Sequence, residues 1–276
     1  MPIAIGGAGG SGTRLIAMII KELGYYIGND LNPALDNLFF SLLFRRKNIL
    51  LDERETVNKL IDLLFISLHG EKRFNLQDME IIRSLSSGDR HNFSEEWLKE
   101  REHNALQFTG KDKHLLIGWK EPNTHIVLHR LLDHNKALKY IHVIRNGLDM
   151  ALSKNQNQLM LWGDCFLNKP VQKCAIDSLK YWNAMHTRLL NIKKSNGDRI
   201  LILNYDKLCS GDLNELEQLF KFIGVQPSRQ IKLNITGLIK PSETIGRHTA
   251  SDFISEISDY DLNKYRDIMS LLENSH

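Results

Sequence analysis

The sequence has few of the features that mark a membrane protein, a disulfide scaffold or a metal site. Its three cysteines, Cys165, Cys174 and Cys209, form no CxxC or zinc-binding spacing. No apolar stretch approaches the length of a membrane span. The net charge is +3, and no long basic run indicates a nucleic-acid partner. Sparse cysteines are typical of a reducing compartment, and a strand predicted from Ile3 leaves no room for a signal peptide, so we expect a cytoplasmic protein.

Short apolar runs, each followed by a helical pattern, predict an α/β fold. These runs cover residues 3–5, 115–118, 140–144 and 200–203. Their alternation with helices predicts a P-loop-like parallel sheet flanked by helices, in one domain over residues 1–276. Ligands of such sheets bind at the carboxyl ends of the strands.

The chain between the first two predicted strands has a helical pattern only. Helical spacing of apolar residues is present at 55–69, and further helices are predicted at 76–85 and 95–106. Because no strand pattern interrupts this stretch, we interpret residues 37–113 as a helical insertion or cap on the domain.

A glycine-rich loop, GGAGGSGTR, follows the first predicted strand at residues 6–14. Five of its nine residues are glycine, which permits close approach of the backbone to a ligand. A loop of this kind that opens a helix offers free N–H groups and the positive end of the helix dipole to an anion.

Three interpretations of this loop compete. Gly7, Gly9 and Gly12 satisfy the G-x-G-x-x-G dinucleotide pattern. Gly7 and Gly12 also have the Walker A spacing of an ATP-dependent kinase, but Thr13 stands where that motif requires lysine. The third interpretation is a loop for 3′-phosphoadenylyl sulfate (PAPS), whose Ser-Gly-Thr core is present at residues 11–13.

A second segment, KYIHVIRNGLDMALS at residues 139–153, favours the third interpretation. Arg145 follows the predicted strand, and Ser153 lies eight positions later, where both can face one pocket. A guanidinium and a hydroxyl suit a phosphate dianion. Together the two segments suit a nucleotide that carries phosphate at both its 5′ and 3′ ends, as PAPS does.

With these motifs the chain resembles the PAPS-dependent sulfotransferases, and most closely their carbohydrate and tyrosylprotein branch. The resemblance rests on the loop at 6–14, Trp119-Lys120-Glu121-Pro122, residues 141–153, Tyr181-Trp182-Asn183, residues 204–208, and the helix at 213–223 with its trailing Gly224. It implies PAPS as sulfate donor, the bisphosphate PAP as product, an acceptor hydroxyl on a small molecule or glycan, and no metal.

The resemblance also implies roles for individual residues. The 5′ loop would comprise Gly9, Gly10, Ser11, Gly12, Thr13 and Arg14, with Arg145 and Ser153 at the 3′-phosphate, Tyr205 near the nucleotide and Arg247 closing over the 3′-phosphate. One departure stands out, because the family usually has Lys or Arg where this chain has Gly10. We expect Arg14 or Lys120 to supply the missing charge if the protein is active.

The catalytic residues are less well defined. Lys120 is implied as the cation near the bridging oxygen, and Asp30, Asp36 and Glu121 remain alternatives for the base. His125 and His129 are spaced i, i+4 but have no evident third ligand, so no metal site is predicted.

Two other functions remain open at this point. They are a nucleotide-binding module that has lost catalysis, given Gly10, and a P-loop kinase that uses ATP. The sequence indicates neither the identity of the acceptor nor an oligomeric state.

Overall fold

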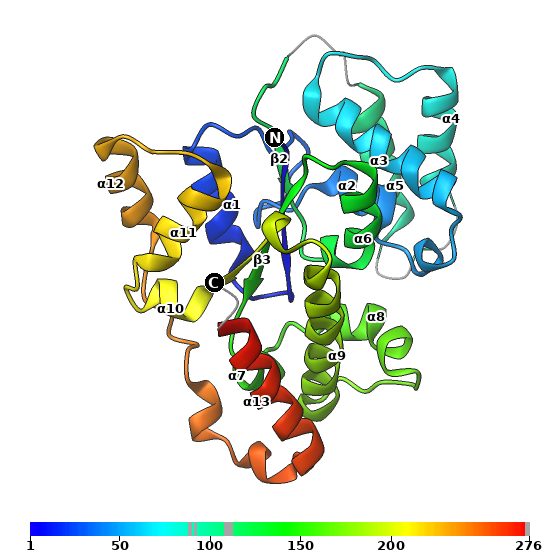
Figure 1. Ribbon diagram of the computed structural model, residues 1–276. Helices are drawn as coiled ribbons and strands as arrows, with labels where there is room; N and C mark the ends of the chain where they lie inside the picture. Colours follow the sequence, from blue (N-terminus) through cyan, green and yellow to red (C-terminus); the bar gives the residue numbers. More distant parts are fainter. Residues whose placement is uncertain (88–89, 91–92, 108–112, 274–276) are drawn as a thin grey trace.

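The computed structural model describes residues 1–87, 90, 93–107 and 113–273, and a parallel sheet lies at its centre (Figure 1). Within these residues the sheet has four strands, β1 (Ile3–Gly7), β2 (Gly118–Lys120), β3 (Lys139–Ile144) and β4 (Ile200–Asn204). Their order is β2-β1-β3-β4, and each neighbouring pair is parallel. The carboxyl ends of the strands therefore meet at one edge. The predicted α/β fold with a parallel sheet flanked by helices is confirmed.

Alternating side chains of the strands pack into two separate cores. Ile3 and Ile5 of β1 pack on one face with Ile16 of the following helix, whereas Ala4 faces the other core. This period of two is the normal consequence of strand geometry, and burial of both faces is typical of parallel sheets.

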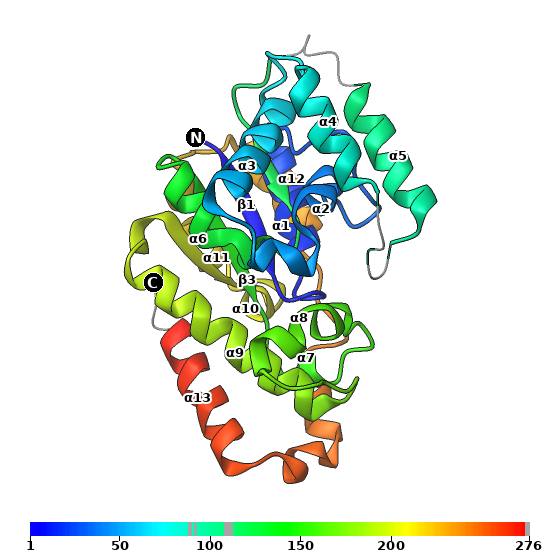
Figure 2. The same cartoon turned by 90° about the vertical axis from the view of Figure 1, so that its right-hand side faces the viewer.

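Helices cover both faces of the sheet (Figures 1 and 2). The first face carries α1 (Thr13–Glu22), α10 (Tyr205–Cys209), α11 (Asn214–Ile223) and α12 (Arg229–Leu238). The second carries α6 (Thr124–His134), α7 (Gly147–Ala151), α8 (Asn157–Leu167), α9 (Ala175–Lys194) and α13 (Asp259–Glu273), with the short turns η2 (Gly197–Arg199), η3 (Arg247–Ala250) and η4 (Asp252–Glu256) nearby. Among the described helices, none is long and apolar enough to cross a membrane.

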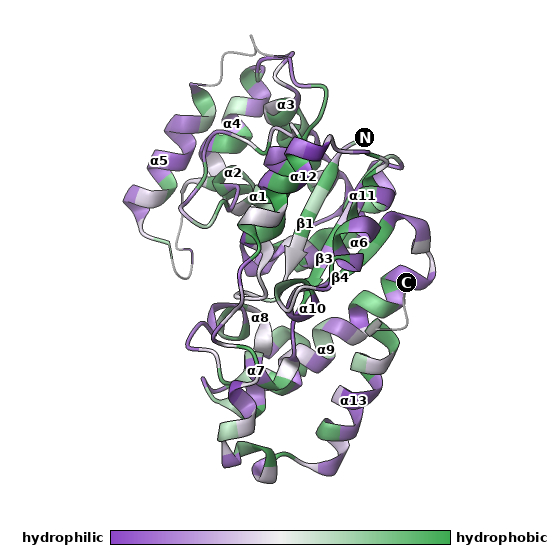
Figure 3. Ribbon diagram, turned by 90° about the vertical axis from the view of Figure 1, so that its left-hand side faces the viewer, coloured by the Kyte–Doolittle hydropathy of each residue, from purple (hydrophilic) through white to green (hydrophobic). Residues whose placement is uncertain are grey.

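The described part of residues 37–113 is helical. It contains α2 (Leu38–Phe44), η1 (Lys47–Leu50), α3 (Arg54–His69), α4 (Leu76–Leu85) and α5 (Glu95–Leu106). Side chains of Asn37, Asn75 and Ser94 cap the starts of α2, α4 and α5. The outer helix α5 is mostly hydrophilic, whereas the strands are mostly hydrophobic (Figure 3). Residues 88–89, 91–92 and 108–112 of this range lie outside the description, and its status as an insertion stays a prediction.

The strand predicted at 115–118 was misplaced. Leu115 and Leu116 are 75% and 42% exposed, and β2 begins only at Gly118. Gly118 pairs with Ile3, the first residue of β1, so the sheet offers no partner strand further upstream. The apolar run instead passes beside Tyr26, whose N–H donates to the carbonyl of Leu116 at 2.9 Å.

Candidate active site

The loop between β1 and α1 has the geometry of an anion site. Gly12 is the N-cap residue of α1 with φ +94°, and among the described residues no side chain caps this helix. The N–H groups of Thr13 and Arg14 are therefore available to a ligand, whereas that of Leu15 donates to the carbonyl of Gly12 at 3.0 Å. Ser11 is fully buried, and its Oγ has no hydrogen-bond partner within the described structure. This hydroxyl lies 2.7 Å from the position of a Cβ at Gly7.

Tyr205 lies directly against this loop. It begins α10, whose N-terminus is capped by the side chain of Asn204. A side chain at Gly12 would overlap the Tyr205 ring. Gly12 is therefore required both by its backbone angle and by the ring beside it.

The loop opens into a cavity of about 710 Å³ at the carboxyl edge of the sheet. Of the residues predicted from sequence, those lining it are Gly9, Gly10, Gly12, Thr13, Arg14, Asp36, Lys120 and Tyr205. Arg14 is exposed, in the first turn of α1. The structure thus brings most of the predicted 5′ loop and the predicted catalytic lysine into one space.

Lys120 and Asp36 form a buried ion pair on the wall of the cavity. The Lys120 ammonium donates to a carboxylate oxygen of Asp36 and, at 3.1 Å, to the carbonyl of Ala34. The other Asp36 oxygen accepts from the Asn32 side-chain amide at 2.7 Å. A carboxylate and an ammonium are therefore held side by side, facing the same cavity.

Asp30, one of the three alternatives for the base, lies elsewhere. It forms an ion pair with Arg101 at 3.0 Å and accepts from the Asn104 side-chain amide at 3.1 Å, and it lines a separate small cavity. Burial raises the pKa of Asp30, although the Arg101 charge and the Asn104 hydrogen bond act in the opposite direction.

Glu121 is buried behind the cavity wall. Its oxygens accept from the backbone N–H and the side-chain amide of Asn123. Burial, and then the negative charge of Asp36, raise the pKa of Glu121 to about 7. Through these contacts Glu121 stabilises the turn after β2. It does not line the cavity.

Arg145 follows β3, as predicted, and is almost fully buried. It pairs with Asp206 at 3.3 Å, donates to the Thr244 hydroxyl at 2.6 Å, and stacks over the Tyr205 ring at 5.4 Å. Burial raises the pKa of Asp206, while the Asn146 N–H and the Arg145 charge lower it. Tyr205 thus contacts both the glycine-rich loop and Arg145.

Arg247 is held near Arg145 by the segment around it. Asp149, in α7, accepts from the backbone N–H groups of Gly246 at 2.7 Å and His248 at 3.0 Å, and contacts the His248 ring at 2.7 Å. Burial, followed by the charge of Arg145, lowers the pKa of Arg247. The Nε of Arg247 is buried and has no hydrogen-bond partner in the described part of the chain.

Ser153, predicted at the 3′-phosphate, lies two residues after the end of α7. Its Oγ accepts from the N–H of Asn155 at 3.2 Å and lies 3.9 Å from the position of a Cβ at Gly10. Ser153 is therefore next to the glycine-rich loop, whereas the hydroxyl bonded to Arg145 belongs to Thr244.

Sequence reasoning missed several residues of the site. Thr244 contacts Arg145, and the segment 237–242, with Lys240, lines the cavity. This segment carries no motif, and only its position after α12 brings it to the carboxyl edge of the sheet.

The fold defines an α/β protein of the P-loop-like class. A comparison with protein families identifies the family within this class. Residues 2–228 match the model of the Sulfotransferase family, so the chain belongs to that family. No curated protein sequence matches the chain.

The comparison with solved structures found sulfotransferases among those similar to the chain. Sulfotransferase STF9 from Mycobacterium avium is 12% identical with a TM-score of 0.44, covering 86% of this chain and 67% of that one. The sulfotransferase domain of the Synechococcus PCC 7002 olefin synthase is 16% identical with a TM-score of 0.42, covering 99% and 94%. Mouse sulfotransferase SULT7A1, solved in complex with PAP, is 11% identical with a TM-score of 0.44, covering 97% and 82%.

Proposed function

We propose that this sulfotransferase moves a sulfuryl group from PAPS to an acceptor hydroxyl. One observation carries the choice of donor: two arrangements suited to anions contact a single aromatic ring. Gly12 of the glycine-rich loop lies against the Tyr205 ring, and the Arg145 guanidinium lies 5.4 Å from the centroid of the same ring. Two separate arrangements beside one ring suit a nucleoside that carries phosphate at both its 5′ and 3′ positions.

The residues present fit such a ligand. Arg247 Nε is a buried polar atom without a partner among the described residues. A phosphate oxygen would satisfy it, and a hydrogen bond to a charged group is worth about 1.5–3 kcal/mol. The N–H groups of Thr13 and Arg14, with the Thr13 hydroxyl, would hold the 5′ end, and Arg145 with Arg247 the 3′-phosphate.

The proposed reaction is an in-line displacement at sulfur. The acceptor oxygen forms a bond to sulfur while the bond from sulfur to the 5′-phosphate oxygen breaks, and PAP leaves with that oxygen. The acceptor proton passes to a carboxylate, for which we propose Asp36, because it lines the cavity beside Lys120 and neither Asp30 nor Glu121 does. Lys120 then stabilises negative charge on the leaving oxygen, so positioning and electrostatics carry the rate.

Arg14 is the proposed substitute for the cation that Gly10 cannot provide. It is exposed in the first turn of α1 and lines the same cavity as Lys120. From there its guanidinium can approach the 5′-phosphate. A glycan hydroxyl is the proposed acceptor, on the resemblance to the carbohydrate branch, and a cytoplasmic location is proposed from the sparse cysteines.

The test compares ligands and then transfer. PAP, ATP and NAD are added in turn and the unfolding midpoint is measured, since a ligand at a hundredfold its Kd adds about 2.7 kcal/mol of stability. We expect PAP alone to stabilise the protein. Transfer of labelled sulfate from PAPS to a panel of glycans, lipids and peptides then identifies the acceptor. Stabilisation by ATP and not by PAP would refute the proposal, and PAP binding without transfer would favour an inert binding module.

A further inference from the structure

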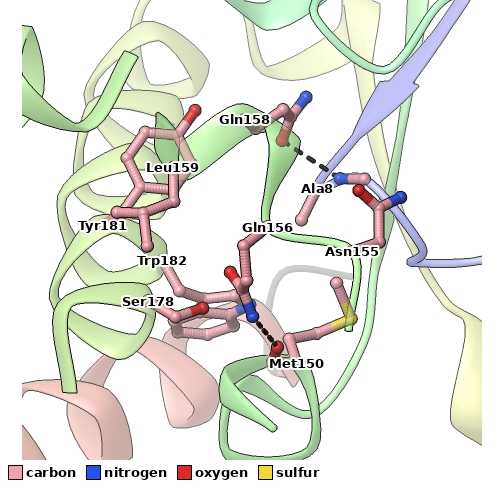
Figure 4. Close-up of a pocket in the computed structure, with 10 residues that line it drawn as sticks. Ala8, Met150, Asn155, Gln156, Gln158, Leu159, Ser178, Tyr181 and Trp182 are labelled. Atoms are coloured by element: carbon pink, nitrogen blue, oxygen red, sulfur yellow. Dashed lines mark hydrogen bonds between the residues drawn. The ribbon is translucent and has the colours of Figure 1, made fainter. Parts of the chain in front are cut away.

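Two glutamines at the start of α8 contact two segments of the site. One segment is the glycine-rich loop, and the other is the chain at the end of α7. Gln158 is buried, and its side-chain amide makes two hydrogen bonds to the glycine-rich loop. Its Oε1 accepts from the N–H of Gly9 at 3.0 Å, and its Nε2 donates to the carbonyl of Gly7 at 3.2 Å. One planar amide therefore fixes the backbone on both sides of Ala8, and Figure 4 shows its oxygen accepting from the loop.

Gln156 makes the equivalent contact with the segment after Arg145. It is also buried, and its Nε2 donates to the carbonyl of Met150 at 3.2 Å (Figure 4). The same Nε2 donates to the carbonyls of Ala151 at 3.2 Å and of Ser153 at 2.8 Å. These carbonyls belong to the last turn of α7 and the residues after it. Gln156 therefore fixes the end of the helix that carries Asp149, which in turn holds the segment around Arg247.

The two glutamines are separated only by Asn157, whose side chain is exposed. Both line a small cavity of about 20 Å³ behind the loop, not the large cavity in front of it. Neither side chain is therefore placed to touch a ligand in the large cavity. Through residues 156–158, their hydrogen bonds connect the glycine-rich loop to the chain at residues 150–153.

We propose that Gln156 and Gln158 form a clamp that couples the 5′- and 3′-phosphate subsites, a role that rests on the proposed function. The clamp holds the two segments at a fixed separation before the ligand arrives, so a nucleotide with both phosphates binds without having to order either segment. An amide is suited to Gln158 because it donates and accepts at once. Gln158 is thus a positioning residue that acts through the Gly7 and Gly9 backbone.

The test compares Gln158→Ala with the neighbouring exposed control Asn157→Ala. Calorimetry measures the binding of PAP, of 5′-AMP and of 3′-AMP to each. In Gln158→Ala we expect 5′-AMP affinity to fall about tenfold, 3′-AMP affinity to fall by less, and PAP affinity to fall further than that of 5′-AMP, because PAP must then order both segments. Equal losses for PAP and 5′-AMP, or the same losses in Asn157→Ala, would overturn the clamp.

A second variant serves if Gln158→Ala does not fold, and a measurement without ligand serves if the parent binds no PAP. Gln158→Glu keeps the side-chain size and the bond from Gly9 but cannot donate to Gly7, so it replaces the alanine variant if that variant does not fold. Hydrogen exchange of the free protein should rise both in residues 7–12 and in residues 150–153 when Gln158 is changed. If the parent binds no PAP, the proposed function is refuted, but hydrogen exchange of the free protein still tests the clamp. A rise in exchange confined to residues 7–12 would overturn the clamp.

Discussion

The ammonium of Lys120, at the end of β2, contacts the carboxylate of Asp36, 84 residues earlier in the chain. The pair is fixed by its surroundings, because the carbonyl of Lys120 accepts from the N–H of Asn37 at 2.7 Å. The turn before α2 and the end of β2 therefore form one rigid wall of the cavity, with both charges presented to it.

The first prediction concerns Lys120. Lys120→Ala should lower turnover about 100-fold or more, the range for losing one electrostatic stabiliser. PAP affinity should change much less, because the charge on the leaving oxygen develops only in the transition state. Steady-state kinetics and calorimetric PAP binding measure the two effects, with exposed Lys21→Ala in α1 as control. Full turnover in Lys120→Ala would rule out the role.

Arg14 provides a contrasting case. Arg14→Ala should weaken PAP binding and turnover together, since its proposed partner, the 5′-phosphate, is charged in the ground state and the transition state alike. The same two measurements apply. A variant that binds PAP normally but turns over slowly would instead give Arg14 the role assigned to Lys120.

Arg145 should discriminate between nucleotides. Arg145→Ala should weaken PAP binding by about 10- to 100-fold, the equivalent of one lost charge-assisted hydrogen bond, and adenosine 5′-phosphosulfate binding little. Calorimetry with both ligands provides the comparison, and exposed Arg229→Ala serves as control. Equal losses for the two nucleotides would mean that Arg145 does not contact the 3′ group.

Replacing Gly10 with the lysine usual in the family should not improve the enzyme. Gly10 has φ +93°, where a side chain costs about 1–2 kcal/mol. A Cβ there would have ordinary contacts, 3.7 Å to Met150 and 3.9 Å to Ser153, so the cost is conformational and not steric. We expect Gly10→Lys and Gly10→Ala to lose similar stability in urea unfolding, with no gain in turnover. Higher turnover in Gly10→Lys at undiminished stability would contradict this.

A chain of buried hydrogen bonds joins β3 to α9. The Nδ1 of His186 lies 2.8 Å from the carbonyl of Trp182 and must donate to it, so its Nε2 accepts from Nε2 of His142 at 3.3 Å. The Nδ1 of His142 then accepts from the Tyr140 hydroxyl at 2.9 Å. This pattern requires neutral histidines, and burial lowers the pKa of His186 to about 4.

This pKa predicts acid sensitivity. Between about pH 4 and 6.5 the unfolded chain protonates His186 and the folded chain does not, so its contribution to stability is complete above pH 6.5 and lost as the pH falls. The loss should reach about 2 kcal/mol at pH 5. Glu121 titrates in the opposite sense, so the test compares parent and His186→Gln by urea unfolding at pH 7.5 and pH 5. Identical pH dependence in both would contradict the prediction.

The sequence was sufficient for the features that depend on local pattern. The glycine-rich loop, three of the strands, the helices 76–85 and 95–106 and the position of Lys120 are as predicted. Each is determined by the periodicity or backbone needs of a few adjacent residues, which are visible without knowledge of the rest of the chain.

The choice between Asp30 and Asp36 was not predictable in this way. Asn32 folds the intervening turn, its Oδ1 accepting from the N–H groups of Ala34 and Asp36, each at 2.9 Å. This turn directs Asp36 to Lys120, while α5 supplies Arg101 to Asp30. Both outcomes depend on elements far away in the chain, and no local spacing reveals them.

The segment held by Asp149 has a consequence for how such proteins diverge. The family match ends at residue 228, yet Thr244 and Arg247, which complete the surroundings of Arg145, lie beyond it. Asp149, inside the match, makes its contacts mainly with backbone N–H groups at positions 246 and 248. Because Asp149 binds backbone N–H groups, these contacts do not depend on which side chains stand at positions 246 and 248. Substitutions in this tail can therefore change the contacts that it makes with a ligand, while the carboxylate of Asp149 still holds its backbone in place.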